Sequence, residues 1–140
     1  MIDMENDIFS AVAVPLREKY GKDAKGQYRI WVSGESADVP ARFPAVTIEE
    51  KDNYVVRRMS TRRIENAANV MYEVNVYTNR VGYKKQDAQE IMSFIDEILA
   101  GLNFTRTMMQ PIDNLSDATI YRLVARYEAT VDTGFMIYQT

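Results

Sequence analysis

The alternation of apolar and polar residues is clearest between residues 69 and 103, where its period changes from two to 3.6. Residues 70–78 alternate in the first way, with Val70, Tyr72, Val74 and Val76 on one side and Glu73, Asn75 and Tyr77 on the other. This period predicts a strand with one buried face. After a turn at residues 79–82, apolar residues recur at helical spacing: Ala88, Ile91, Met92, Ile95, Ile98, Leu99 and Leu102, widened by Phe94. The second pattern predicts an amphipathic helix folded back over a sheet.

The ends of this helix carry recognisable signals. Asp87 to Glu90 has the spacing of a capping box, and a start one turn earlier at Lys84 fits the same pattern. At the other end, Gly101 followed by Leu102 favours a Schellman stop.

A second apolar stripe near the N-terminus predicts another helix, over residues 5–20. Its members are Ile8, Phe9, Val12, Leu16 and Tyr20. Candidate caps precede the stripe at residues 3–6, and Gly21 follows it as a stop. Pro15 lies inside the pattern and removes one backbone hydrogen bond, so we expect a kink or a break near residues 11–14.

Further segments have the period of strands, at residues 28–32, 45–50, 104–110 and 119–132. The first is expected to bury Tyr28, Ile30 and Val32 on one side. The last is long enough to be central in its sheet, with residues 121, 123, 125, 127, 129 and 131 on one face. We expect a loop at residues 33–44 and a turn at residues 111–117. The apolar tail Phe135–Tyr138 is too short to stand alone, so it must pair with its own sheet or with a neighbour's.

These elements predict a single α+β domain over residues 1–140. A chain of 140 residues with 46% hydrophobic content can bury about two-thirds of its unfolded surface. We expect a mainly antiparallel sheet of five to six strands packed with two helices, in the order α-β-β-β-α-β-β.

Composition excludes several kinds of chemistry. The chain has no cysteine and no histidine, which removes disulfides, Ser-His and Cys-His catalysis and the usual zinc ligands. The net charge of −3 argues against a surface dedicated to nucleic acid. We see neither a signal peptide nor a membrane span, and therefore expect a soluble protein made in the cytoplasm. We also expect no cofactor and no metal.

Four arginines gather in the segment from Asp52 to Ala68: Arg57, Arg58, Arg62 and Arg63. The segment has no apolar face there, so we interpret it as a long exposed excursion between two paired strands. One interpretation of the arginines is a solvated loop. The other is contact with a partner, which is either an acidic protein surface or DNA in transit. Between these two partners, we prefer the protein.

Two groups of carboxylates are weaker candidates for a catalytic or metal site. Glu49, Glu50 and Asp52, or Asp113 and Asp117, could form an acid/base pair or an oxygen-ligand metal site, but neither spacing is that of a calcium loop. Aromatic residues on the strands are interpreted as core. Trp31 is different, because it lies on the face opposite Tyr28, Ile30 and Val32, and we expect it to be exposed in the monomer and covered in an assembly.

Taken in order, four stretches resemble the small tail-terminator proteins of long-tailed bacteriophages and of prophages in Gram-positive bacteria, which are also called tail-completion or minor capsid proteins. They are Phe43–Glu50, Tyr72–Asn79, the helix Lys84–Leu99, and Phe104–Thr107 with Asn114–Tyr127. With Asp132 as its end, the resemblance spans about two-thirds of the chain. The helix at residues 5–20 is similar in position.

The resemblance implies a structural protein of the virion rather than an enzyme. Such proteins form a ring, a hexamer by the sixfold symmetry of tails, that caps the tail tube at the tail-neck junction and joins it to the head-completion (neck) protein. DNA passes the ring only in transit, and no membrane is involved. The candidate subunit interface is Trp31 with Phe135, Met136, Ile137 and Tyr138. The alternatives are a neck or adaptor protein at another step of head-tail joining, or a carboxylate-dependent hydrolase.

Overall fold

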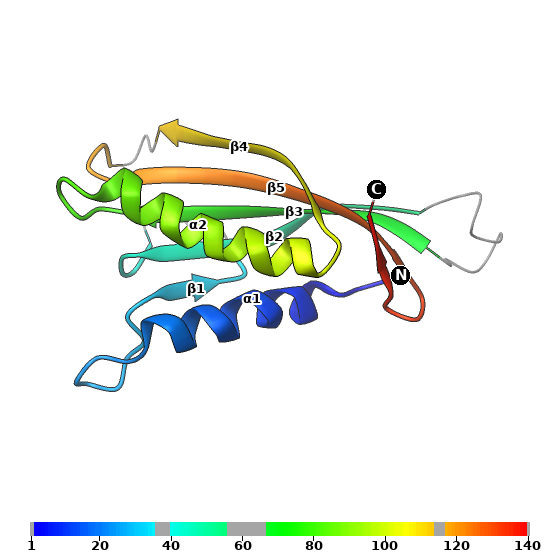
Figure 1. Ribbon diagram of the computed structural model, residues 1–140, viewed down its shortest axis with the longest axis horizontal. Helices are drawn as coiled ribbons and strands as arrows, with labels where there is room; N and C mark the ends of the chain where they lie inside the picture. The colour runs from blue at the N-terminus through cyan, green and yellow to red at the C-terminus, as the bar shows by residue number, and fades with distance from the viewer. Residues whose placement is uncertain (1, 36–39, 56–66, 114–116, 140) are drawn as a thin grey trace.

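A computed structural model describes residues 2–35, 40–55, 67–113 and 117–139 of the chain (Figure 1). The described residues form two helices and six strands, and these are α1 Glu5–Tyr20, β1 Trp31–Ser33, β2 Ala45–Val55, β3 Ala67–Thr78, α2 Lys84–Gly101, β4 Thr105–Asp113, β5 Tyr121–Asp132 and β6 Ile137–Tyr138. The predicted α+β class and element order are confirmed.

The six strands form one sheet in the order β1-β2-β3-β5-β4, and β6 pairs with β5 beyond the start of β4. β1 runs parallel to β2, and the other pairs are antiparallel. Twelve residue pairs join β3 to β5, from Ala67 opposite Asp132 to Thr78 opposite Tyr121. These two strands are therefore the centre of the sheet, as predicted for the strand near residues 119–132.

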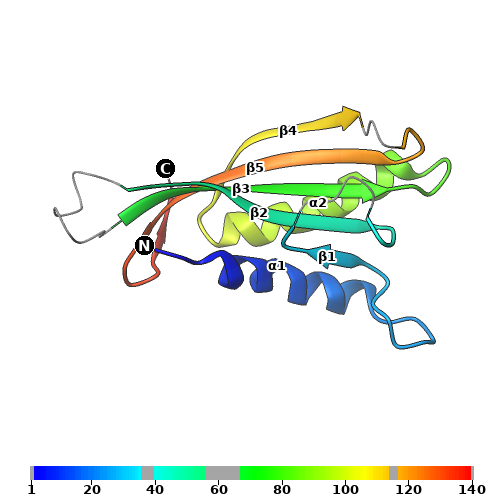
Figure 2. The ribbon, with the colours of Figure 1, turned by 180° about the vertical axis from the view of Figure 1, so that it is seen from behind.

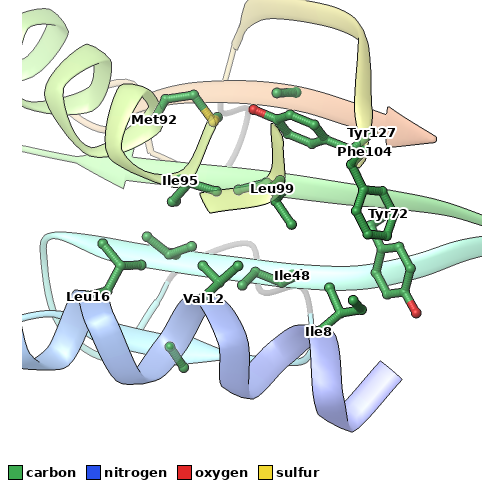
Figure 3. Packing of buried hydrophobic residues seen from close by; sticks show 14 of the residues in the cluster. Ile8, Val12, Leu16, Ile48, Tyr72, Met92, Ile95, Leu99, Phe104 and Tyr127 are labelled. Atoms are coloured by element: carbon green, nitrogen blue, oxygen red, sulfur yellow. The ribbon is translucent and has the colours of Figure 1, made fainter. Parts of the chain in front are cut away.

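Both helices cover the same face of the sheet, because their apolar stripes enter one core with the inward residues of the strands (Figure 3). Ile8, Val12 and Leu16 of α1 point at β2, and Ile95 and Leu99 of α2 point at β3 and β5. The rings of Tyr72 and Phe104 meet edge to face at 5.6 Å. This apolar layer is the main source of stability.

α1 runs unbroken from Glu5 to Tyr20 with Pro15 inside it, so the alternative of a break is wrong. It ends at Gly21, whose φ of 70° lies in the left-handed region. The Arg17 side chain also donates to the Val32 carbonyl of β1, at 3.5 Å. A side chain of the helix thereby bonds a backbone acceptor of the short first strand.

α2 begins at Lys84, which selects the earlier of the two predicted starts. A Schellman motif does end the helix, but two residues later than predicted, because Asn103 rather than Gly101 takes the left-handed conformation, with φ of 69°. The Phe104 N–H donates to the Leu99 carbonyl at 3.0 Å, and the Asn103 N–H donates to the Ala100 carbonyl at 3.1 Å. Asparagine tolerates this conformation better than most residues do.

Three predicted boundaries are wrong. The first strand contains only Trp31–Ser33, and Tyr28 is 39% exposed where we expected it to be buried, because it forms a single bridge to Lys22 outside the sheet. The ends of the predicted excursion belong to β2, which reaches Val55, and to β3, which starts at Ala67. Residues 111–113 extend β4 instead of forming a turn. A proline is tolerated there since β4 is an edge strand.

The C-terminal tail pairs with its own sheet, which decides between the two predicted partners. Ile137 lies opposite Val131 and Tyr138 opposite Thr130. The side-chain amide of Asn103 also donates to the Ile137 carbonyl at 2.9 Å. β6 is therefore tied both to β5 and to the end of α2.

Replacement of Ile95 by aspartate should destabilise the fold by about 3–5 kcal/mol, because it places an unpaired charge in the apolar layer. Ile95 is 0% exposed. Ser93→Asp puts the same charge on the exposed side of α2 and should change the free energy of unfolding by less than about 0.5 kcal/mol. Urea unfolding followed by circular dichroism measures both, and equal midpoints would contradict the packing of α2.

Alkaline pH should also unfold the protein, through Tyr127. Burial raises the pKa of this phenol, and the hydrogen bond that its hydroxyl donates to Asp96 at 2.9 Å raises it further. The unfolded chain therefore loses this proton near pH 10, before the folded chain does. The stability contributed by Tyr127 is complete below that pH and is lost as the pH rises above it.

The variant Tyr127→Phe has no phenol to titrate at this position, so its stability should fall less between about pH 8 and pH 11. The control is Tyr83→Phe, because Tyr83 is 49% exposed. Urea midpoints over the pH range test this. If the urea midpoint of Tyr127→Phe falls with pH as steeply as that of the control, Tyr127 is not the group that titrates.

Candidate functional site

The face of the sheet opposite the helices is the candidate site, and Figure 2 views the molecule from this side. We call it the helix-free face. Strand alternation directs side chains of the three central strands onto it, among them Ala45, Thr47 and Glu49 from β2, Glu73, Asn75 and Tyr77 from β3, and Arg122, Val124 and Arg126 from β5. Their neighbours in sequence enter the core on the other side. The face is mainly polar in its middle and apolar at one end.

Trp31 belongs to the apolar end of this face. It lies opposite Ile30 and Val32, as predicted, but it is half-buried where we expected exposure. The reason is a small second cluster, in which Trp31 and Phe43 pack against Ala45, Tyr77 and Ile120. The sequence pattern predicted the direction of the indole but could not indicate that Phe43 and Ile120 would pack beside it.

The middle of the face holds a chain of hydrogen bonds between β3 and β5. The Glu73 carboxylate accepts from Arg126 Nε at 3.1 Å and from Asn75 Nδ2 at 3.2 Å. Asn75 Oδ1 in turn accepts from Arg122 Nε at 2.8 Å, and the Arg122 guanidinium lies 5.7 Å from the centre of the Tyr77 ring. Asn75 is 1% exposed and Glu73 9% exposed. This network gives partners to polar groups that would be costly to bury alone.

Glu49 of β2 lies directly opposite Glu73 on the same face. Two carboxylates in this position repel each other. Arg126 offsets the charge of Glu73, and Lys51 lies 3.7 Å from Glu49. Glu49 Oε1 and Thr47 Oγ1 are nevertheless buried, and neither has a hydrogen-bond partner among the residues that the structure describes. Both atoms lie beneath the surface of the face rather than on it.

The carboxylates considered for catalysis on β2 are divided between the two sides of the sheet, with Asp52 opposite Met71 on the same side as Glu49. Glu49 lies on the helix-free face, whereas Glu50 points to the helix side and accepts from the Tyr72 hydroxyl at 3.3 Å. Burial raises the pKa of Glu50, while that hydrogen bond opposes the shift. Asp117 is engaged in its own turn, where the hydroxyl and N–H of Thr119 lower its pKa. In the part of the chain that the structure describes, no three acidic side chains are grouped as a metal site requires.

The predicted interface residues of the tail lie far from Trp31. Phe135, Met136 and Tyr138 are about half-exposed, whereas Ile137 packs against the core. Both Trp31 and the tail can be located along β5. Strand pairing across β2 and β3 sets Trp31 level with Arg122 of β5, and Tyr138 pairs directly with Thr130 of β5. Eight residues along β5 separate these positions by about 26 Å, at about 3.3 Å per residue. The two parts of the predicted interface are therefore separate surfaces.

The arginines predicted to contact a partner lie outside the described residues. Residues 56–66 include all four of them: Arg57, Arg58, Arg62 and Arg63. Their proposed role stays a prediction.

Sequence reasoning missed the network around Glu73. Its signal was present, because Glu73 and Asn75 alternate on one strand, and Arg122 and Arg126 share one face of another. What was lacking is the register that sets Glu73 opposite Arg126, since periodicity predicts faces but not which strands are neighbours.

Comparison with known proteins adds no assignment: the chain matches no protein-family model, and no curated protein matches it. Neither helix in the described part of the chain has the length and apolar character needed to cross a membrane.

Replacement of Arg126 by alanine should lower the free energy of unfolding by about 1–3 kcal/mol, because it leaves the Glu73 carboxylate largely buried beside Glu49 without its guanidinium. Adding Glu73→Gln to this variant removes the uncompensated charge and should recover part of the loss. Lys51→Ala, which removes the longer ion pair, is the control and should cost less than about 0.5 kcal/mol. Equal costs for Arg126→Ala and Lys51→Ala in urea unfolding would contradict the role of the network.

Proposed function

We propose that this protein is a structural component of a bacteriophage tail, which forms a ring that caps the tail tube and joins it to the head-completion protein. The observation that carries the proposal is the ordered resemblance of four stretches between Phe43 and Asp132 to tail-terminator proteins. The α+β fold that the resemblance implies agrees with the structure.

The surfaces of the molecule support a role in assembly. A ring made of identical chains needs two different, complementary surfaces on each copy. The chain has a helix-free face that is polar in its middle, and it has half-exposed apolar residues at its C-terminal end. These surfaces are unlike each other, as head-to-tail contact requires.

The placement of the carboxylates favours this proposal over a hydrolase. A general acid and base must both reach one substrate. Glu49 and Glu50 point to opposite sides of β2, and the Glu73 carboxylate is occupied by Arg126 and Asn75. Such groups are better suited to hold strands together than to exchange protons with a substrate.

The proposal is tested with the tail-tube protein encoded in the same phage or prophage genome. Tubes assembled with this protein should end at one extremity in a ring visible by negative-stain electron microscopy, and they should stop growing. Tubes assembled without it should lengthen without limit. Light scattering coupled to size exclusion should give the number of copies in the ring, which we expect to be six from the resemblance.

Two results would count against the proposal. Tubes that grow equally with and without the protein would exclude termination. Binding to head-completion protein but not to tubes would support the alternative of a neck or adaptor protein instead.

A further inference from the structure

We propose that Phe135 and Met136 of one copy insert into a pocket at the opposite end of the next copy. This inference rests on the proposed function, because it takes the occupant of the pocket to be a second copy of this chain. We call these two residues the terminal knob. The pocket, called the end pocket, is lined by Tyr20, Arg29, Phe43, Pro44, Asn79 and Ile91, among others.

The terminal knob is a built feature of the chain. Asp132 accepts hydrogen bonds at Oδ1 from the N–H groups of Gly134 and Met136, at 2.9 and 3.0 Å, and at Oδ2 from the Tyr138 hydroxyl at 2.9 Å. Its backbone exchanges further bonds with Phe135 and Met136. These bonds lower the pKa of Asp132, with the Met136 N–H as the largest cause. One carboxylate thus fixes the whole turn.

Phe135 occupies a strained position at the tip of this turn. Its φ of 60° is in the left-handed region, which bulky residues rarely adopt, and its side chain is 55% exposed. Met136 beside it is 58% exposed. A strained backbone that presents apolar side chains to solvent gains nothing for the isolated fold, and such strain is typical of functional positions. An apolar partner would remove both side chains from water.

The end pocket offers such a partner. Its volume is about 570 Å³, and its apolar lining comes from Tyr20 at the end of α1, Phe43 and Pro44 before β2, and Ile91 of α2. A pocket of this size with apolar walls and a polar rim has the usual character of a binding site. Two aromatic rings, a proline and an isoleucine suit a phenylalanine and the flexible side chain of methionine.

The position of the two surfaces prevents a chain from filling its own pocket, and the proposed ring supplies the next copy as the occupant. Thr78, at the pocket, is in register with Tyr121, and Ile137, next to the knob, is in register with Val131. Ten residues along β5 separate these positions by about 33 Å, so a chain cannot fill its own pocket. Figure 1 shows the β3–α2 turn at one end of the molecule and β6 at the other. Contact between unlike ends is heterologous and continues from copy to copy.

Charged side chains of both signs also line the pocket, namely Arg29, Arg80, Asp87 and Glu90, and Arg80 pairs with Asp87 at 2.7 Å. The Arg29 side chain lines the pocket and makes no hydrogen bond or ion pair within the described part of the chain.

The chain contains no cysteine, so introduced cysteines can report this contact without background. The double variant Met136→Cys and Asn79→Cys carries one thiol on the knob and one at the pocket, both at exposed positions. A short bis-maleimide should join the copies into a ladder of multiples, on the free protein at high concentration and on capped tubes. Each single variant should give no ladder, because position 136 of one copy faces position 79 of the next.

A second variant measures the contribution of the phenylalanine. Phe135→Ser should weaken self-association roughly 30-fold, as expected for the loss of a central aromatic contact. Val14→Ser is the matched control, because Val14 is an apolar residue that is 51% exposed on α1, and it should leave association unchanged. Circular dichroism checks that both variants fold.

The outcomes separate this inference from the proposed function. Rings on tubes without a cross-linked ladder, or with Phe135→Ser associating as tightly as Val14→Ser, would overturn the knob contact and leave the ring intact. Cross-linking of Met136→Cys alone would indicate contact between like ends and overturn it as well. Failure to form any ring, alone or on tubes, would refute the proposed function itself.

Discussion

The structure depends on the antiparallel pairing of β3 with β5. Their twelve residue pairs form the centre of the sheet, and every other strand is attached to one of them, directly or through β2. The pairing joins residues that are on average about 54 positions apart in sequence, so closing the loop between them costs considerable entropy. Burial on both faces of the sheet must offset this cost. On one face the helices supply that burial. On the other, hydrogen bonds between side chains accompany it.

The inward and outward side chains of the same strands are stabilised in different ways. The inward positions can be apolar because α1 and α2 exclude water from them. Three outward residues of β3, Glu73, Asn75 and Tyr77, are also buried. Burial of Glu73 and Asn75 is costly unless each finds a partner. Arg126 and Arg122 are those partners. A register shift of one residue would separate them and expose the apolar face at the same time.

Local pattern predicted most of the fold, because helix and strand periods are properties of short segments. The strand at residues 70–78, the helix over Ala88–Leu102 and the order of elements follow from it. What it could not predict depends on distant residues. Trp31 is half-buried through Phe43 and Ile120, and Tyr28 is exposed because the first strand begins only after it. The tail Phe135–Tyr138 was singled out from the sequence and its interface role stays a prediction, whereas the polar network of the helix-free face was missed.

A protein that must remain separate before assembly and then associate specifically needs few unsatisfied groups, placed where only the correct partner reaches them. The network satisfies most buried charge of the helix-free face within the chain, which keeps that face from binding arbitrary donors. The exposed apolar knob is small, and Asp132 holds its backbone turn in one conformation, so in the proposed contact little backbone entropy would be lost on binding. Specificity would then come from a small knob that excludes partners without a matching pocket, rather than from a broad apolar surface.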